Sequence, residues 1–132
     1  IVDLMSTPSG TELARPFLPT RDFEASKRFY ETLGFKKMLD SEVAIFSTGS
    51  GGFILQRLYS EAWAEMCMMQ LMVDDLDAWW THIEKLDLSA NFNVAAPKAP
   101  AMQPWGLRVA YVIDPAGVLW HIAERRPGVA HD

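Results

Sequence analysis

The sequence predicts an α+β fold in which each half of the chain supplies one strand, one helix and three further strands. Two observations carry this prediction. Two runs with the apolar spacing of an amphipathic helix begin at Asp22 and Asp75 and share several residue types. Short alternating apolar stretches surround both runs in the same order, separated by glycines. Because one helix covers only one face of a sheet, we expect a curved mixed sheet with a cleft.

The first half begins with a candidate strand at residues 11–19. The helix follows in DFEASKRFYETLGF, residues 22–35, where the apolar side chains recur at helical spacing and Gly34 stands at the C-cap. Three candidate strands come next, at residues 35–40, 43–49 and 51–58. A short helical linker is expected at 58–65.

The second half repeats this order. A candidate strand at 66–73 precedes a helix at 75–88, for which Asp75 is the expected N-cap. The last turn is predicted at Asp114-Pro115-Ala116-Gly117. We expect residues 95–104, AAPKAPAMQP, to form an irregular proline-rich loop. Three candidate strands complete the half, at residues 89–95, 106–114 and 117–124.

Length and composition are typical of one globular domain. The chain has 132 residues, of which 49% are hydrophobic, enough to bury a core. We therefore expect a single domain over residues 1–132, built of a first module at 11–58 and a second module at 66–125.

Charge and cysteine content exclude several functions. A net charge of −5 argues against nucleic acid as a partner and favours a cationic ligand. No apolar run approaches the roughly 18 residues of a membrane span, and the first residues, IVDLMSTPSG, lack the pattern of a signal peptide. The single cysteine, Cys67, has no partner for a disulfide. These observations predict a cytoplasmic protein with no membrane partner.

Several motifs resemble the vicinal oxygen chelate superfamily, and within it the bleomycin resistance proteins. They are FYETLGF, VDDLDAWW, QPWG and DPAG, within residues 13–125. The resemblance implies the glyoxalase/bleomycin resistance fold of paired βαβββ modules. It also implies a homodimer that confers antibiotic resistance by holding a small-molecule drug in clefts at the subunit interface.

Metal-dependent members of this superfamily carry four ligands, and the equivalent positions here are Arg15, Gln56, Met68 and His121. Arginine offers only hydrogen-bond donors, and a thioether is a poor ligand for hard or borderline divalent ions. Gln56 and His121 alone are too few for a closed or catalytic site. We therefore predict no metal and no cofactor.

The same positions are candidates for ligand binding. Strand alternation places His121 on the cleft face, where it is a hydrogen-bonded core histidine, a ligand contact, or a metal ligand or general base. Gln56 faces the cleft by the same reasoning, as a ligand contact or a solvated glutamine. Met68 and Gln70 share one face of their strand, and methionine there fills the core or adapts to a ligand. Arg15 stacks on a flat ligand or forms a surface ion pair.

Tryptophan is abundant, and five occur in the chain. Trp79, Trp80 and Trp120 fall on apolar faces and are assigned to packing. Trp105 lies between Pro104 and Gly106 with no periodic reason for burial, so it is the first candidate for an aromatic ligand platform. Of the remaining histidines, His82 lies on the second helix and is expected to be solvated, and His131 lies in the terminal tail.

Three hypotheses follow. The favoured one is a binding module that sequesters an aromatic, cationic compound without chemistry and has no catalytic residues. The second is a lyase, isomerase or dioxygenase with a divalent metal at Gln56 and His121. The third is an assembly domain whose cleft is vestigial.

Overall fold

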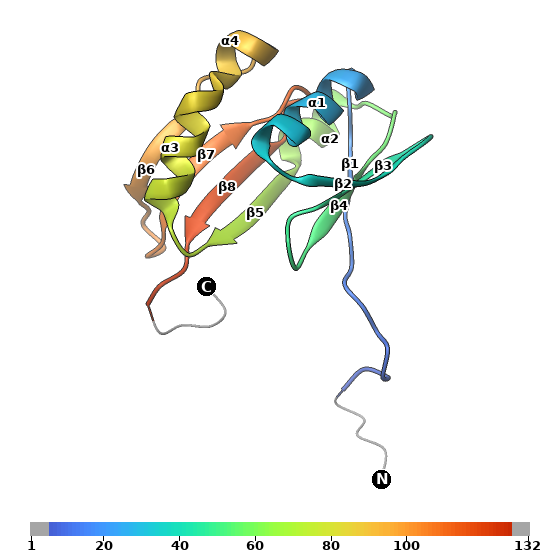
Figure 1. Ribbon diagram of the computed structural model, residues 1–132, viewed down its shortest axis with the longest axis horizontal. Helices are drawn as coiled ribbons and strands as arrows, with labels where there is room; N and C mark the ends of the chain where they lie inside the picture. Colours follow the sequence, from blue (N-terminus) through green and yellow to red (C-terminus); the bar gives the residue numbers. More distant parts are fainter. Residues whose placement is uncertain (1–5, 128–132) are drawn as a thin grey trace.

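The computed structural model describes residues 6–127 and has two sheets flanked by helices (Figure 1). The first half of the chain has the order strand, helix and three strands, and then a linker helix. These elements are β1 (Phe17–Leu18), α1 (Phe23–Leu33), β2 (Lys36–Asp40), β3 (Ala44–Ser47), β4 (Gly52–Leu55) and α2 (Glu61–Met66). The second half repeats the order with one extra helix. Its elements are β5 (Met68–Val73), α3 (Leu76–Leu86), α4 (Leu88–Phe92), β6 (Lys98–Met102), β7 (Arg108–Ile113) and β8 (Leu119–Glu124).

The strands form two mixed sheets with the same topology. The strand orders are β1-β4-β3-β2 and β5-β8-β7-β6. In each sheet the first strand of the half pairs in parallel with the last, and the other pairs are antiparallel. The α+β class and the repeated strand-helix-three-strand order are therefore confirmed, with the strands divided between two four-stranded sheets.

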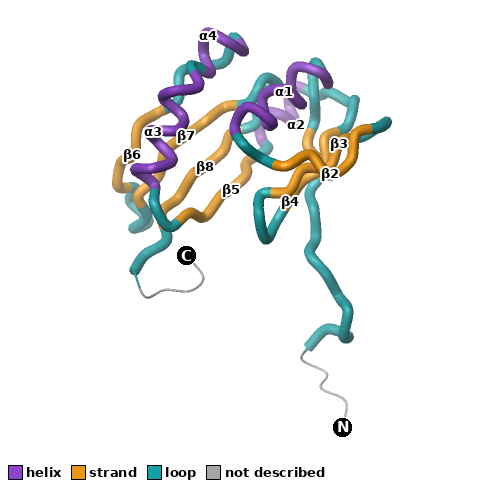
Figure 2. The backbone as a smooth tube through the Cα atoms, in the orientation of Figure 1, coloured by secondary structure: helices purple, strands orange, loops and turns teal. Residues whose placement is uncertain are grey.

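Each main helix begins and ends as local rules require. The carboxylates of Asp22 and Asp75 accept hydrogen bonds from backbone amides in the first turns of α1 and α3, at 3.1 and 2.9 Å. Gly34 ends α1 with φ of 111°, a left-handed conformation that favours glycine. Helix α3 lies against the second sheet (Figure 2), where it contacts β6, β7 and β8. The opposite face of the second sheet carries no helix.

A buried hydrogen-bonded chain joins the two halves. Trp120 Nε1 donates to the hydroxyl of Tyr30 at 2.9 Å, and this hydroxyl donates to Asp114 Oδ2 at 2.5 Å. Asp114 Oδ1 accepts the backbone amides of Ala116 and Val118, each at 2.9 Å. Burial raises the pKa of Asp114, and the hydrogen bond from Tyr30 opposes this rise. Tyr30 comes from α1 and the other members from β8 and its turn, so the chain spans the core shared by both halves.

The segment after α3 differs from the prediction. Residues 89–95 are not a strand, because Leu88–Phe92 form helix α4, whose Leu88 and Phe92 are one helical turn apart and pack on the core. Residues 95–104 are not irregular throughout, because Lys98–Met102 form β6. Pro100 is tolerated there because β6 is an edge strand with an irregular register.

The predicted environment of His82 is also wrong. His82 Nε2 lies 2.8 Å from the carbonyl oxygen of Leu33, at the end of α1, and its ring meets Trp79 edge-on. His131 lies outside the described residues. Within residues 6–127, no helix has both the length and the apolar character needed to cross a bilayer.

We predict that Tyr30→Phe destabilises the protein by about 2 kcal/mol, because the variant leaves Trp120 Nε1 and one oxygen of Asp114 without their partner in the core. Urea unfolding measures the change in unfolding free energy. The control is Tyr59→Phe, whose hydroxyl accepts from Arg21 at the surface, and we expect a loss below about 0.5 kcal/mol. Equal losses in the two variants would contradict the structural importance of the buried chain.

Candidate functional site

A row of polar side chains crosses the uncovered face of the second sheet. Cross-strand pairing sets Lys98 of β6 opposite Tyr111 of β7, Tyr111 opposite His121 of β8, and His121 opposite Gln70 of β5. Paired residues of neighbouring strands project from the same face, so these four side chains lie side by side. Within residues 6–127, none of the four has a side-chain hydrogen bond or ion pair to the rest of the protein. This polar row is the centre of the candidate site.

Apolar side chains border the polar row on both sides. Ile113, Leu119 and Met68 are aligned on one side by the pairing of β7, β8 and β5. Val109, Ala123 and Met72 are aligned on the other, where Val109 and Ala123 are buried. Met68 is 62% exposed, although its side chain is apolar. The face therefore presents hydrogen-bonding groups within an apolar surround, which is the usual lining of a small-molecule site.

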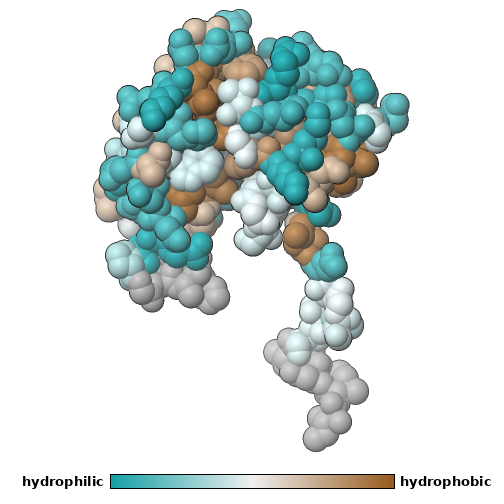
Figure 3. All heavy atoms as spheres, in the orientation of Figure 1, coloured by the Kyte–Doolittle hydropathy of each residue, from teal (hydrophilic) through white to brown (hydrophobic). Residues whose placement is uncertain are grey.

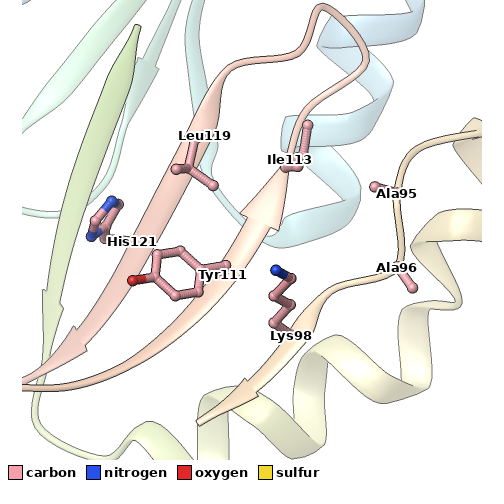
Figure 4. A pocket seen from close by; sticks show the side chains of 7 residues that line it. All are labelled: Ala95, Ala96, Lys98, Tyr111, Ile113, Leu119 and His121. Carbon is pink, nitrogen blue, oxygen red and sulfur yellow. The ribbon is translucent and has the colours of Figure 1, made fainter. Parts of the chain in front are cut away.

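A pocket of about 470 Å³ lies over part of this face (Figure 4). This volume is in the range of ordinary ligand sites. The labelled side chains come from β6, β7 and β8 and from the segment before β6, and no residue of the first half contributes. The lining residues are Ala95, Ala96, Lys98, Tyr111, Ile113, Leu119 and His121.

Trp105 stands at the edge of this site. It lies in the turn between β6 and β7, where Gln103 N donates to Leu107 O at 2.8 Å and Gly106 N donates to Gln103 O at 2.9 Å. Its ring centroid is 6.2 Å from that of His121, and the side chain is 55% exposed. Trp105 is not part of the pocket lining, and its role as an aromatic platform for a ligand stays a prediction.

The ring of His121 contacts two aromatic rings. The Tyr111 ring meets it edge-on with 4.8 Å between the ring centroids, and the Trp105 ring is tilted against it at 6.2 Å. Partial burial lowers the pKa of His121 below 6.5, so the imidazole is neutral at pH 7. Of the readings open to this residue, a hydrogen-bonded core histidine does not match the geometry, because no partner for its ring nitrogens is found within residues 6–127.

The six predicted site residues divide between the two sheets. Met68, Gln70 and His121 share one face of the second sheet, with Trp105 beside them. Arg15 lies beside Gly52 of the first sheet, where an added Cβ would be 3.5 Å from Arg15 Nε. Gln56 follows β4, and its backbone carbonyl accepts the Thr20 hydroxyl at 2.6 Å. Within one chain, Arg15 and Gln56 do not line the pocket.

The four positions equivalent to metal ligands do not fit a metal ion. Arg15 is a cation, Met68 offers only a thioether, and Gln56 belongs to the other sheet from His121. Across residues 6–127, no group of three or more His, Cys, Asp or Glu side chains is arranged to hold a metal. A catalytic metal site needs at least three protein ligands, and only two of these four positions, Gln56 and His121, hold a possible ligand.

Sequence reasoning missed two members of the polar row, Lys98 and Tyr111. Tyr111 was available from strand alternation, because it has the parity of Val109 and Ile113 in a correctly predicted strand. Lys98 was not, since its segment was assigned to a loop and only the pairing with β7 places it on this face.

We predict that the imidazole of His121 titrates below pH 6.5, because burial disfavours its charged form. The unfolded chain then binds the proton more readily, so the stability contributed by neutral His121 is present above pH 6.5 and is lost as the pH falls below it. Proton NMR of the ring follows the titration, and His121→Gln identifies the resonance. A midpoint at or above 6.5 would show that the environment of His121 is misjudged.

Known proteins share this architecture. No model of a protein family matches the sequence. A bleomycin resistance protein from Klebsiella pneumoniae is 32% identical over 130 residues, covering 86% of this chain and 93% of the relative. A bleomycin-binding protein solved in complex with bleomycin has a TM-score of 0.74 and 26% identity, covering 88% of this chain and 100% of that one.

A second solved structure is the bleomycin-binding protein of bleomycin-producing Streptomyces verticillus in complex with copper(II)-bleomycin. It has a TM-score of 0.71 and 25% identity, covering 90% of this chain and 100% of that one. With the repeated strand-helix-three-strand architecture and the motifs FYETLGF, QPWG and DPAG, these similarities place the chain among the bleomycin resistance proteins of the vicinal oxygen chelate superfamily.

Proposed function

We propose that this protein binds and sequesters a flat aromatic small molecule without transforming it. The observation that carries the proposal is the polar row beside Trp105, exposed on a sheet face with a pocket of ligand size. The bleomycin resistance protein and the bleomycin-binding proteins to which the chain is similar support it. A binding protein needs groups that recognise its ligand, and the row supplies hydrogen-bonding groups beside aromatic rings.

The site has a group for each requirement of such a ligand. Trp105 and Tyr111 offer aromatic surface on which a flat ring stacks. Leu119 and Ile113 bury its apolar edge, and Met68 adapts its unbranched side chain to irregular shapes. Gln70 and His121 can orient the ligand through hydrogen bonds, because neither side chain has a hydrogen-bond partner within residues 6–127.

We also propose that the protein works as a homodimer. Apolar side chains reach the surface (Figure 3), and the largest include Phe17, Met66 and Met68, which are 51%, 81% and 62% exposed. Residues 6–16 are exposed and extend away from the body of the chain (Figure 1). A second copy that covers the second sheet with its first sheet would bury this apolar surface. It would also bring its Arg15 and Gln56 to the polar row.

The cellular setting follows from composition. We infer a cytoplasmic location from the single cysteine, and we infer that nucleic acid is not a partner from the net charge of −5.

We predict saturable quenching of tryptophan fluorescence by a flat aromatic compound, at about one ligand per chain. The titration uses metal-free bleomycin, copper-loaded bleomycin and a panel of flat aromatic compounds of different charge. Trp105→Ala should weaken binding about tenfold, because one aromatic contact is lost. Trp105→Phe keeps a ring and should retain most of the affinity, and Trp63→Phe on α2 controls for the change in fluorescence. Unchanged affinity in Trp105→Ala would show that the site is misplaced.

We predict that the protein sediments as a dimer at micromolar concentration. Met68→Lys should shift it toward monomer, because the variant places a charge in an apolar interface. The matched control is Thr81→Lys, at an exposed position of α3 on the helical side. A wild-type protein that sediments only as monomer would overturn the dimer proposal.

A further inference from the structure

The charges of this acidic protein are unevenly distributed over its two sheets. In the second sheet, the side chains of the uncovered face come from alternating positions of β5, β6, β7 and β8. None of these positions holds Asp or Glu. They are occupied by Met68, Gln70, Met72, Lys98, Ala101, Val109, Tyr111, Ile113, Leu119, His121 and Ala123.

The acidic residue of β8 lies on the opposite, helical face. Glu124 accepts from the backbone amide of Leu76 at 3.3 Å and pairs with Arg108 at 3.3 Å. Arg108 also pairs with Asp77 of α3. The carboxylates near this sheet are therefore used to join it to α3, and they are separated by the sheet from the pocket.

Among the described residues that line the pocket, only Lys98 is charged. Two of the other lysines, Lys27 and Lys37, are neutralised by neighbouring carboxylates. Lys27 pairs with Glu24 and Asp40 at 3.0 and 2.9 Å, and Lys37 pairs with Glu31 and Asp40 at 3.2 and 2.9 Å. Within residues 6–127, Lys98 has no carboxylate partner. It therefore presents an uncompensated positive charge at the rim of an apolar pocket.

Lys98 is the one member of the row that can only donate hydrogen bonds. Tyr111, Gln70 and neutral His121 each carry a donor and an acceptor, so they can meet either kind of ligand group. Figure 4 shows Lys98, Tyr111 and His121 on adjacent strands. A ligand group that satisfies Lys98 must supply an acceptor, and hydrogen bonds to a charged acceptor are the stronger ones.

We infer that the ligand of this site is an aromatic anion, a flat ring bearing a carboxylate or sulfonate that Lys98 binds. The inference rests on the proposed function and narrows its ligand class. It is the opposite of the cationic ligand that we expected from the net charge of −5. The distant acidic groups are screened over about 8 Å at physiological salt, whereas Lys98 contacts the ligand directly. The local charge therefore decides which ligands are held.

The first sheet carries the same sign of charge. Arg15 lies beside Gly52. Lys36 of β2 is opposite Ser47 of β3 in the strand register, on the face of the sheet away from α1. The acidic residue of β2, Asp40, is turned to the helical side, where Lys27 holds it. If a second copy covers the pocket with this sheet, it adds cations to the site.

The test compares two ligands that share a ring and differ in charge, 2-naphthoate and 2-naphthylmethylammonium. Amide NMR titration of the wild-type protein measures both affinities and shows which residues respond. We expect the anion to bind at least tenfold more tightly, with the largest shifts in β7 and β8. Lys98→Gln should weaken the anion about tenfold, and Lys98→Glu should reverse the preference. Lys85→Gln, on the exposed side of α3, is the matched control and should change neither affinity.

The outcomes separate this inference from the proposed function. Tighter binding of the ammonium, or equal binding of both ligands with no effect of Lys98→Gln, would overturn the anion preference and leave aromatic binding in place. If neither naphthalene nor bleomycin binds at millimolar concentration, the proposed function fails and the inference fails with it. A preference for 2-naphthoate that survives in Lys98→Glu would overturn the role of Lys98.

Discussion

The hydrogen-bonded chain from Trp120 through Tyr30 to Asp114 is the constraint on which the arrangement of the two halves depends. A carboxylate buried without partners is strongly unfavourable, so the folded core needs the hydroxyl and the two turn amides in their places around Asp114. Because the hydroxyl belongs to α1 and the amides to the turn before β8, this requirement fixes the first helix against the last strand. The face of β8 that carries His121 is thereby held away from the core.

The two halves have the same topology but different roles at the site. Both sheets pair their first and last strands in parallel and leave one face without a helix. In the second sheet, that face carries the polar row and the pocket. In the first, the corresponding strands present mainly apolar side chains such as Phe17 and Ile54. Repetition of a fold therefore does not repeat a site, because the exposed residues vary while the buried ones maintain the packing.

The sequence was sufficient for the elements whose signals are local. The N-caps Asp22 and Asp75, Gly34, and the apolar stripes of α1 and α3 are set within a few residues, so both helices were predictable. The strand β6 was not, because Lys98–Met102 contains a proline and takes its strand conformation from pairing with β7. The site residues were likewise predictable only where a local pattern places them. Gln70 and His121 came from alternation, whereas Lys98 depended on a register that no local pattern reveals.

The position of Pro100 has a consequence for how far the protein can assemble. A sheet edge with available backbone amides templates the addition of further strands, and this leads to fibres and aggregates. Pro100 removes one amide from β6, and the irregular register beside it distorts the edge. The outer edge of the second sheet is thus a poor template. Growth by edge pairing is disfavoured there, so copies of the chain are less able to join through this edge into fibres.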